Sequence, residues 1–389
     1  MIDLTLSEHD RKILEVVREQ ALICREHARY YDEHEEEFPP DEIPGAEHLD
    51  PYALLGQSSE NDSPLPVMSM LIAAGQAWGD YSVRIRQDGG GLGNAALQAT
   101  GTPEQIERWG RKRLAMAITE PGCGSDSKAI QTTAVLDGDE WVLNGEKIFV
   151  TTGCKADGIV VWATIDKSAG RAGIKSFIVF KGTPGFEVTH KEKKLGIRAD
   201  DTAAMVFRDC RIPRDHLLGR DESIAKKGAG GFRGVMKTFN STRPFVAAIG
   251  LGMARAALDF TREALAREGI EVDWSAGKPS RSALQQQLVE IEADIEAAML
   301  DVLHAMWMTS EGQPNNMEAS IAKAKGGEVA RTATSRCLEI LGAIGITREH
   351  LAEKWFRDAR ITDIYEGTGQ IQRLIIARQL LGYSSAELS

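Results

Sequence analysis

Apolar residues recur at helical spacing near the start of the chain. Ser7 and Asp10 have the spacing of a capping box, in which each side chain bonds the other residue's backbone N–H. They precede an apolar stripe made of Ile13, Leu14, Val17, Ala21, Cys24, Ala28 and Tyr31. This spacing predicts an amphipathic helix. Further helices are predicted over 67–78 and from Thr102 through Trp109.

The last third of the chain returns to the helical period. Helices are predicted over 243–267, 321–341 and 371–381. Another is predicted from the apolar stripe of Leu284, Leu288, Ile291, Ile295, Met299 and Leu303. Long helices with wide apolar stripes usually pack as bundles, and such stripes often serve subunit interfaces as well.

Between these regions the pattern changes to the alternation of β-strands. Strands are predicted over 132–136, 141–143, 147–151, 158–165, 174–180 and 204–207. Asp137-Gly138 and Asn144-Gly145 are predicted as hairpin turns between the first three. We therefore expect a helical N-terminal domain over 1–114, a middle β domain over 115–222, built as a barrel or a sandwich, and a helical C-terminal bundle over 223–389.

Composition narrows the class of protein. The 389 residues include 46 Lys and Arg against 57 Asp and Glu, a net charge of -11, which argues against binding to nucleic acid or to an anionic membrane. The five cysteines are far apart in the sequence, which fits free thiols in a reducing compartment. No export signal or membrane span is recognisable, so we expect a cytoplasmic protein. The eight histidines lack the spacing of a metal site, and no metal is expected.

A glycine-containing segment, ITEPGCGSD over 118–126, lies where the first helical region meets the β segment. Its glycines allow backbone N–H groups to approach a ligand closely, and Thr119 and Ser125 add hydroxyls. These features suit a pyrophosphate or the edge of a flavin. Composition alone also fits a plain glycine loop.

A second segment, DARITDIYEGTGQIQR over 358–373, places Glu366 between two apolar residues and the start of a helix. Burial there would favour the neutral carboxyl group, which is the tuning that a general base needs. The alternative is an acid that only interacts with the helix dipole. Two shorter segments accompany it, NGEKIFVTTG over 144–153 and FNSTRP over 239–244.

Together these segments resemble the acyl-CoA dehydrogenase family of FAD-dependent flavoproteins. The similarity covers roughly residues 100 to 380 and is most specific in ITEPGCGSD and IYEGTGQIQR, whereas the first hundred residues match loosely. The resemblance implies an α+β multi-domain fold with a helical N-terminal domain, a middle β-barrel and a C-terminal four-helix bundle.

The resemblance also implies a role for each matched residue. Glu366 is the expected catalytic base, and Arg243 lies close to its carboxylate. Contacts with FAD are implied for Ile118, Thr119, Gly124, Ser125, Phe149, Val150, Thr151, Thr368 and Gln370. Contacts with the substrate are implied for Ser125, Arg243, Tyr365 and Gly367. Phe149 stands where the family usually has Trp over the flavin, so stacking is retained while the indole N–H is lost.

The implied reaction is the α,β-dehydrogenation of an acyl-CoA thioester. Glu366 takes the α-proton, the β-hydrogen leaves as hydride to flavin N5, and the electrons pass to an electron-transferring flavoprotein. One alternative is an acyl-CoA oxidase or other flavin oxidase of the same fold. Another is a catalytically vestigial relative that is DNA-associated or acts as a scaffold. The acidic charge and the intact YEGT at 365–368 count against this last alternative.

Two substitutions bear on assembly. In the family the adenosine end of each FAD is usually held by a neighbouring subunit. Here Glu339 stands in place of a glutamine and Ala343 in place of a glycine. Because Glu339 would repel an anionic cofactor, we expect either a homodimer or homotetramer with altered adenosine contacts, or a hetero-oligomer in which another chain completes the site.

Overall fold

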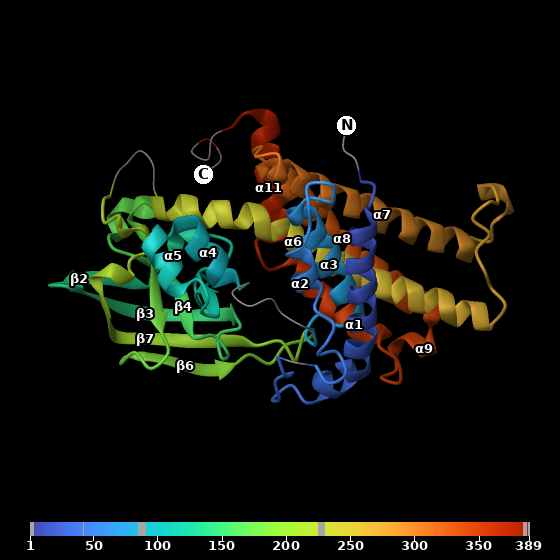
Figure 1. Ribbon diagram of the computed structural model, residues 1–389, viewed down its shortest axis with the longest axis horizontal. Coiled ribbons are helices and arrows are strands. Elements are labelled where there is room, and N and C mark those ends of the chain that lie inside the picture. The colour runs from blue at the N-terminus through green and yellow to red at the C-terminus, as the bar shows by residue number, and fades with distance from the viewer. Residues whose placement is uncertain (1–3, 42, 85–90, 225–229, 384–386, 388–389) are drawn as a thin grey trace. The chain divides into compact units, whose positions relative to one another are not determined.

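The chain divides into two compact units (Figure 1). The computed structural model describes residues 4–41, 43–84, 91–224, 230–383 and 387. The helical unit comprises Met1–Ile85, Lys194–Ala199 and Asn240–Ser389, and the sheet unit comprises Arg86–Lys193 and Asp200–Phe239. The division into three domains at 114/115 and 222/223 stays a prediction.

The helical unit confirms the helices expected at both ends of the chain. Its helices are α1 (Glu8–Glu33), α2 (Pro51–Leu55), α3 (Leu65–Gly79), α7 (Ala283–Ser310), α8 (Asn316–Leu341), α9 (Ala343–Ile346), α10 (Ala352–Ala359) and α11 (Gly369–Leu381), with the 3-10 helices η5 (Lys278–Ser280) and η6 (Arg360–Asp363). The predicted capping box starts α1, since the Asp10 N–H donates to Ser7 Oγ at 3.0 Å and the Ser7 N–H donates to Asp10 Oδ2 at 2.9 Å. Helices α2, α9 and α10 were not predicted.

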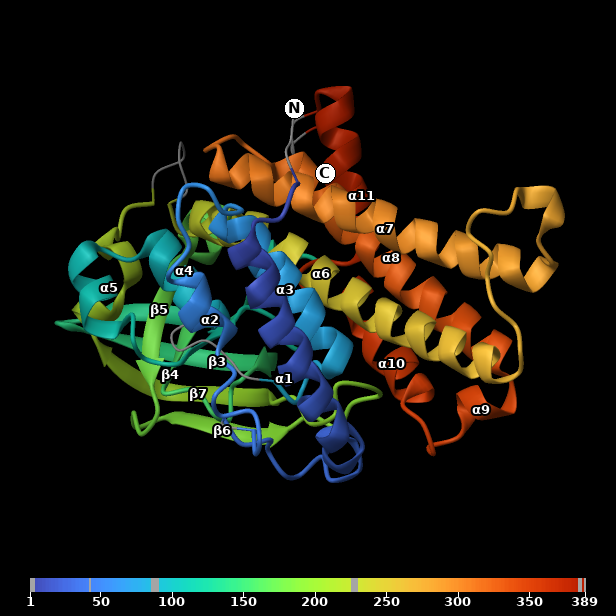
Figure 2. The ribbon, with the colours of Figure 1, turned by 45° about the vertical axis from the view of Figure 1, so that its right-hand side comes forward.

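Close approaches of helices build the core of this unit. Helices α1 and α3 lie side by side in Figures 1 and 2. Gly79 of α3 allows this close approach, because a Cβ at this position would lie only 2.5 Å from the carbonyl oxygen of Ala21. Most of the predicted stripe of α7 is buried, with Leu288, Ile291 and Ile295 nearly inaccessible, whereas Leu284 and Met299 are partly exposed. This apolar burial is the main stabilising term of the unit.

Helix α6 spans Gly230–Arg267 and begins earlier than predicted. The sequence segment before Pro244 was expected to open the helix, but Pro244 lies inside it. Proline has no N–H to bond the carbonyl four residues earlier. That carbonyl, on Asn240, is instead contacted by Asn315 Nδ2 at 3.5 Å. By length and composition Phe239–Arg267 could cross a membrane, but 78% of its apolar window is buried, as in a core helix.

The described residues of the sheet unit form one seven-stranded sheet, which confirms the predicted β segment. Its strands are β1 (Leu114–Ala117), β2 (Thr133–Asp137), β3 (Glu140–Thr151), β4 (Gly158–Thr164), β5 (Ile174–Phe180), β6 (Phe186–Lys191) and β7 (Thr202–Pro213). They lie in the order β1-β4-β2-β3-β7-β6, with β5 paired to β4. The unit also holds α4 (Leu92–Thr100), α5 (Pro103–Trp109) and the 3-10 helices η1 (Ser127–Ala129), η2 (Lys167–Gly173), η3 (Arg214–His216) and η4 (Leu218–Arg220).

Strand β4 is buried on both faces. Val160 and Trp162 point into one apolar cluster together with residues of α4 and α5, whereas Ile159 and Val161 point into another. Side chains of a strand alternate between its two faces, so each face of β4 contributes to a separate core. The predicted cap at Thr102 is confirmed and starts α5, which packs against the first of these clusters. Strands β1 and β6 and helix α4 were not predicted.

One predicted turn is wrong. Asp137-Gly138 does join β2 to β3, but Asn144-Gly145 lies within the continuous strand β3, where the pairing with β7 shifts register. Gly145 has φ 150°, and a Cβ at this position would lie 2.5 Å from Thr132 Oγ1. The glycine therefore serves a bulge that packs against its neighbour, a use of Asn-Gly that local sequence does not separate from a turn.

Gly145→Ala should lower the free energy of unfolding by about 3 kcal/mol, because the new methyl group overpacks Thr132 in addition to straining the backbone. The matched change in the true turn, Gly138→Ala, should cost only about 1 kcal/mol, since Gly138 has φ 64° but open space around it. Urea denaturation of both variants measures the difference. An equal loss of stability in the two variants would contradict the close packing of Gly145 against Thr132.

Candidate active site

Glu366 lies in a tight turn between η6 and α11, with φ 58°, in the left-handed region that is unusual for a residue other than glycine. The next residue, Gly367, has φ 88°. Thr368 then caps α11 by accepting a hydrogen bond from the Ile371 N–H at 3.3 Å. The turn is therefore fixed at one end by the start of a helix.

The carboxylate of Glu366 is partly buried and accepts a hydrogen bond from the Thr242 hydroxyl, with 2.7 Å between Oγ1 and Oε2. Burial raises the pKa of Glu366 above its ordinary value, although the Thr242 bond and the charges of Arg243 and Lys323 act in the opposite direction. The predicted direction of this shift is confirmed. A carboxylate with a raised pKa is a stronger base toward a weakly acidic C–H.

Arg243 of α6 is almost completely buried, with 3% of its surface exposed. Its Nη1 makes long contacts with three neutral acceptors, Asn240 Oδ1 at 3.4 Å, Asn316 Oδ1 at 3.3 Å and Ser320 Oγ at 3.5 Å. Burial lowers the pKa of Arg243 to about 10, and the Glu366 charge opposes this shift. The structure thus brings the predicted base and the predicted arginine together.

Two side chains hold the backbone of the Glu366 turn. Lys323 Nζ, on α8, donates to the Gly367 carbonyl at 3.0 Å. Gln372 Nε2, on α11, donates to the carbonyls of both Glu366 and Gly367 at 3.1 Å.

Sequence reasoning missed three of these side chains, Thr242, Lys323 and Gln372. For Lys323 a signal was available, because the Gly326-Gly327 pair inside the same helix is locally unfavourable and therefore indicates close packing around it.

The other predicted residues of the helical unit flank this turn. Tyr365 is partly buried and donates its backbone N–H to the Ile361 carbonyl at 3.1 Å. Gln370 is exposed in the first turn of α11. A Cβ on Gly367 would lie 2.5 Å from Gln372 Nε2, so this glycine permits the close contact that Gln372 makes.

In the sheet unit, the end of β3 presents an aromatic ring to solvent. Phe149 has φ 56°, lies at a second register shift of β3, and exposes 59% of its surface. Thr151 is partly exposed. Val150 points into the core and is 1% exposed, so only its backbone is available for the predicted flavin contact.

A buried ion pair connects β3 to the ITEPGCGSD segment. Lys147 Nζ donates to Glu120 Oε1 at 2.8 Å and to the Ile118 carbonyl at 2.9 Å. The Ile148 N–H donates to the Thr119 carbonyl at 2.9 Å. These bonds place Thr119 beside the strand that carries Phe149.

The residues of this unit fit a flavin. The Cα positions of Gly122 and Gly124 face open space, where a ligand can approach the backbone closely, and Ser125 is exposed beside them. The exposed ring of Phe149 offers an apolar stacking face. Hydroxyl groups and accessible backbone N–H groups suit the polar parts of a flavin nucleotide, and an aromatic face suits its ring.

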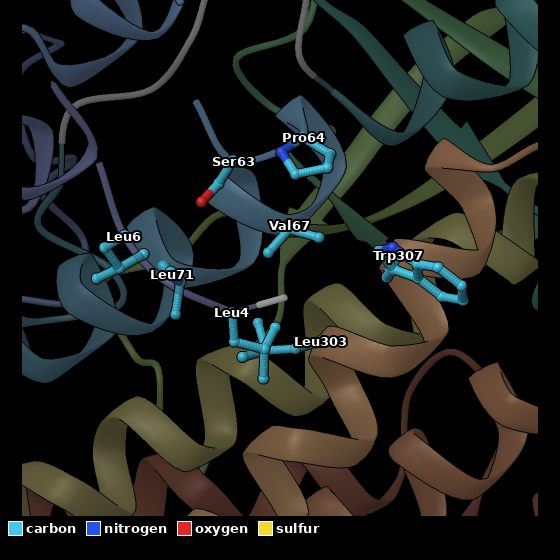
Figure 3. A pocket seen from close by; sticks show the side chains of 8 residues that line it. All are labelled: Leu4, Leu6, Ser63, Pro64, Val67, Leu71, Leu303 and Trp307. Atoms are coloured by element: carbon cyan, nitrogen blue, oxygen red, sulfur yellow. The ribbon is translucent and has the colours of Figure 1, made fainter. Parts of the chain in front are cut away.

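A small apolar pocket of about 30 Å³ lies elsewhere in the helical unit (Figure 3). It is lined by Leu4, Leu6, Ser63, Pro64, Val67, Leu71, Leu303 and Trp307. None of these is a predicted site residue, and the pocket is too small for a cofactor or an acyl group.

Comparisons with known proteins agree with this geometry. The model of the acyl-CoA dehydrogenase middle domain matches residues 115–210, and that of the C-terminal domain matches residues 229–381. The mitochondrial short-chain specific acyl-CoA dehydrogenase of Bos taurus is 40% identical over 287 residues, covering 72% of this chain and 67% of the relative.

Two solved structures extend the similarity to nearly the whole chain. Butyryl-CoA dehydrogenase from Megasphaera elsdenii is 30% identical, with a TM-score of 0.82 over 98% of this chain and 100% of that one. A glutaryl-CoA dehydrogenase from Mycobacterium smegmatis in complex with FADH2 is 25% identical, with a TM-score of 0.80 over 98% and 96% of the two chains.

The chain therefore belongs to the acyl-CoA dehydrogenase family. The predicted fold and enzyme class, an oxidoreductase, are confirmed. The predicted reaction, FAD-dependent dehydrogenation of an acyl-CoA thioester, is confirmed at the level of the family. The roles of the individual site residues stay predictions.

Lys147→Met should destabilise the protein by about 3–5 kcal/mol, because it leaves the Glu120 charge buried without its ionic partner. The double variant Glu120→Gln/Lys147→Met should recover much of this loss, since no uncompensated charge remains. Urea denaturation of the three proteins tests the pair. A double variant no more stable than Lys147→Met would show that the ion pair is not the cause.

Proposed function

We propose that this protein oxidises short-chain acyl-CoA thioesters to 2-enoyl-CoA and that Glu366 removes the α-proton. One observation supports this assignment most strongly. The Glu366 carboxylate has a raised pKa through burial, yet it is held in place by the Thr242 hydroxyl with the Arg243 and Lys323 cations nearby. Such surroundings combine basicity with a fixed position, which general-base catalysis requires.

The reaction consists of a proton transfer and a hydride transfer. The C–H bond at the α-carbon breaks, its proton passes to a Glu366 oxygen, and its electron pair forms the α,β double bond as the β-hydrogen leaves. FAD, when bound, would supply the two-electron acceptor for that hydride. The substrate loses one proton and one hydride, so the atoms and electrons balance.

The backbone of Glu366 contributes a second effect. The resemblance to the family assigns its N–H to the thioester carbonyl, where a donor stabilises the negative charge that develops as the α-proton leaves. The left-handed φ of 58° fixes the direction of this N–H relative to the side chain. A single residue would therefore orient both the base and the hydrogen-bond donor.

Each unit carries residues that we propose as contacts of FAD. In the sheet unit they are Ile118, Thr119, Gly124, Ser125, Phe149, Val150 and Thr151. In the helical unit they are Thr368 and Gln370 at the start of α11. We propose Ser125, Arg243, Tyr365 and Gly367 as contacts of the substrate. The short acyl chain is supported by relatives that are named for short-chain and butyryl substrates.

Glu366→Gln should leave flavin binding intact and lower the rate of flavin reduction by butyryl-CoA at least about 100-fold, since the amide keeps the shape and loses the basicity. The control is Gln370→Ala, which should weaken flavin retention without removing the base. Stopped-flow absorbance with a panel of acyl-CoA thioesters measures both effects. If Glu366→Gln kept a tenth of the wild-type rate, another residue would be the base.

We further propose that the enzyme assembles as a homo-oligomer and passes its electrons to an electron-transferring flavoprotein. Glu339, on the exposed side of α8, has its carboxylate 3.4 Å from Ser335 Oγ. Its charge in place of an amide favours altered contacts with the adenosine end of FAD. The competing arrangement is a hetero-oligomer with another chain of the family.

The chain purified alone should hold close to one FAD per subunit and have the solution mass of a dimer or tetramer. Flavin content and light scattering on the same sample measure both quantities. Weak flavin retention that a co-expressed homologue restores would instead establish the hetero-oligomer.

A further inference from the structure

Lys323 is a buried lysine that the reaction described above does not use directly. Its side chain is completely inaccessible, in the middle of α8, a part of the helix rich in small residues. Burying an ammonium group is unfavourable unless it is bonded or paired. Its Nζ donates to the Gly367 carbonyl at 3.0 Å, one residue beyond the proposed base.

The position of Lys323 depends on two glycines in the next turn of α8. A Cβ on Gly326 would lie 2.6 Å from Ala247 Cβ of α6. A Cβ on Gly327 would lie 3.0 Å from the Thr362 carbonyl oxygen of η6. The helix can therefore approach both elements closely, and this approach brings Lys323 against the turn.

The turn that Lys323 contacts is strained. A left-handed conformation costs a residue with a side chain about 1–2 kcal/mol, and Glu366 adopts one with φ 58°. Such a conformation persists only when surrounding bonds determine it. The Gly367 carbonyl, which follows directly, accepts from both Lys323 and Gln372, so the ammonium is one of two donors that hold the turn.

Two cations act on the Glu366 carboxylate. Arg243 faces it from α6 and Lys323 from α8, and both favour the carboxylate form. Asp363 of η6 interacts electrostatically with Lys323. Burial lowers the pKa of Lys323 to about 8, so Lys323 carries its charge at acidic pH.

We propose that Lys323 is a positioning residue of the reaction, which holds the Glu366–Gly367 turn through the Gly367 carbonyl and stabilises the carboxylate form of Glu366 by its charge. This inference rests on the proposed role of Glu366 as the base. It assigns to one side chain two effects that can be separated, a hydrogen bond and a charge.

The test compares Lys323→Met, which removes both effects, with Lys323→Gln, which keeps a donor without the charge. Loss of the cation raises the pKa of Glu366, and the reaction needs the carboxylate. The acidic limb of the rate of flavin reduction by butyryl-CoA should therefore move to higher pH by about one unit in both variants. The maximal rate should fall about tenfold in Lys323→Met and less in Lys323→Gln, because the retained donor still holds the turn.

The control is Thr334→Val, a change at another completely buried polar residue of α8, whose hydroxyl bonds only within the helix in the contacts described. Thermal unfolding of all variants is measured beside the rates. Thr334→Val should lower the unfolding temperature without moving the acidic limb. If Lys323→Met does not fold, Lys323→Gln carries the same test of the charge.

An active Lys323 variant whose acidic limb stays at the wild-type pH would overturn the inference and leave Lys323 a structural residue. That result would leave the proposed function standing. Full activity of Glu366→Gln would overturn the proposed function, and the inference with it.

Discussion

The left-handed turn at Glu366 and Gly367 is the constraint on which the candidate site depends. It combines an unfavourable backbone conformation with a partly buried carboxylate, and both persist only because other groups bond them. Thr242 bonds the carboxylate, whereas Lys323 and Gln372 bond the backbone. These side chains come from α6, α8 and α11, so the close packing of three helices sets the position of one base.

The sheet unit uses a related arrangement around Phe149. This residue also has a positive φ, 56°, and it follows a strand segment that the buried pair of Lys147 and Glu120 connects to the neighbouring loop. In both units a residue with a proposed function stands in an unfavourable backbone conformation, with a buried lysine bonded to a carbonyl nearby. Backbone strain of this kind is common at functional sites, where the surrounding structure holds the strained conformation in place.

Local sequence predicted the elements whose signals lie within a few residues. The caps at Ser7 and Thr102 and the apolar stripe of α7 depend on neighbours in the chain, and all were recognised. The bulge at Gly145 was mistaken for a turn because its cause is Thr132, which is distant in sequence.

The same distinction applies to the site. The resemblance to the family pointed to Glu366 and Arg243, whereas Thr242, Lys323 and Gln372 act through contacts that only the packed helices create.

The most direct test of the proposed proton transfer is the rate at which butyryl-CoA deuterated at the α-carbon reduces the bound flavin without oxygen, compared with unlabelled butyryl-CoA. Slower reduction by the deuterated substrate is the predicted result, because its α C–H bond breaks as Glu366 takes the proton. Equal rates, or no reduction by any acyl-CoA thioester, would contradict it.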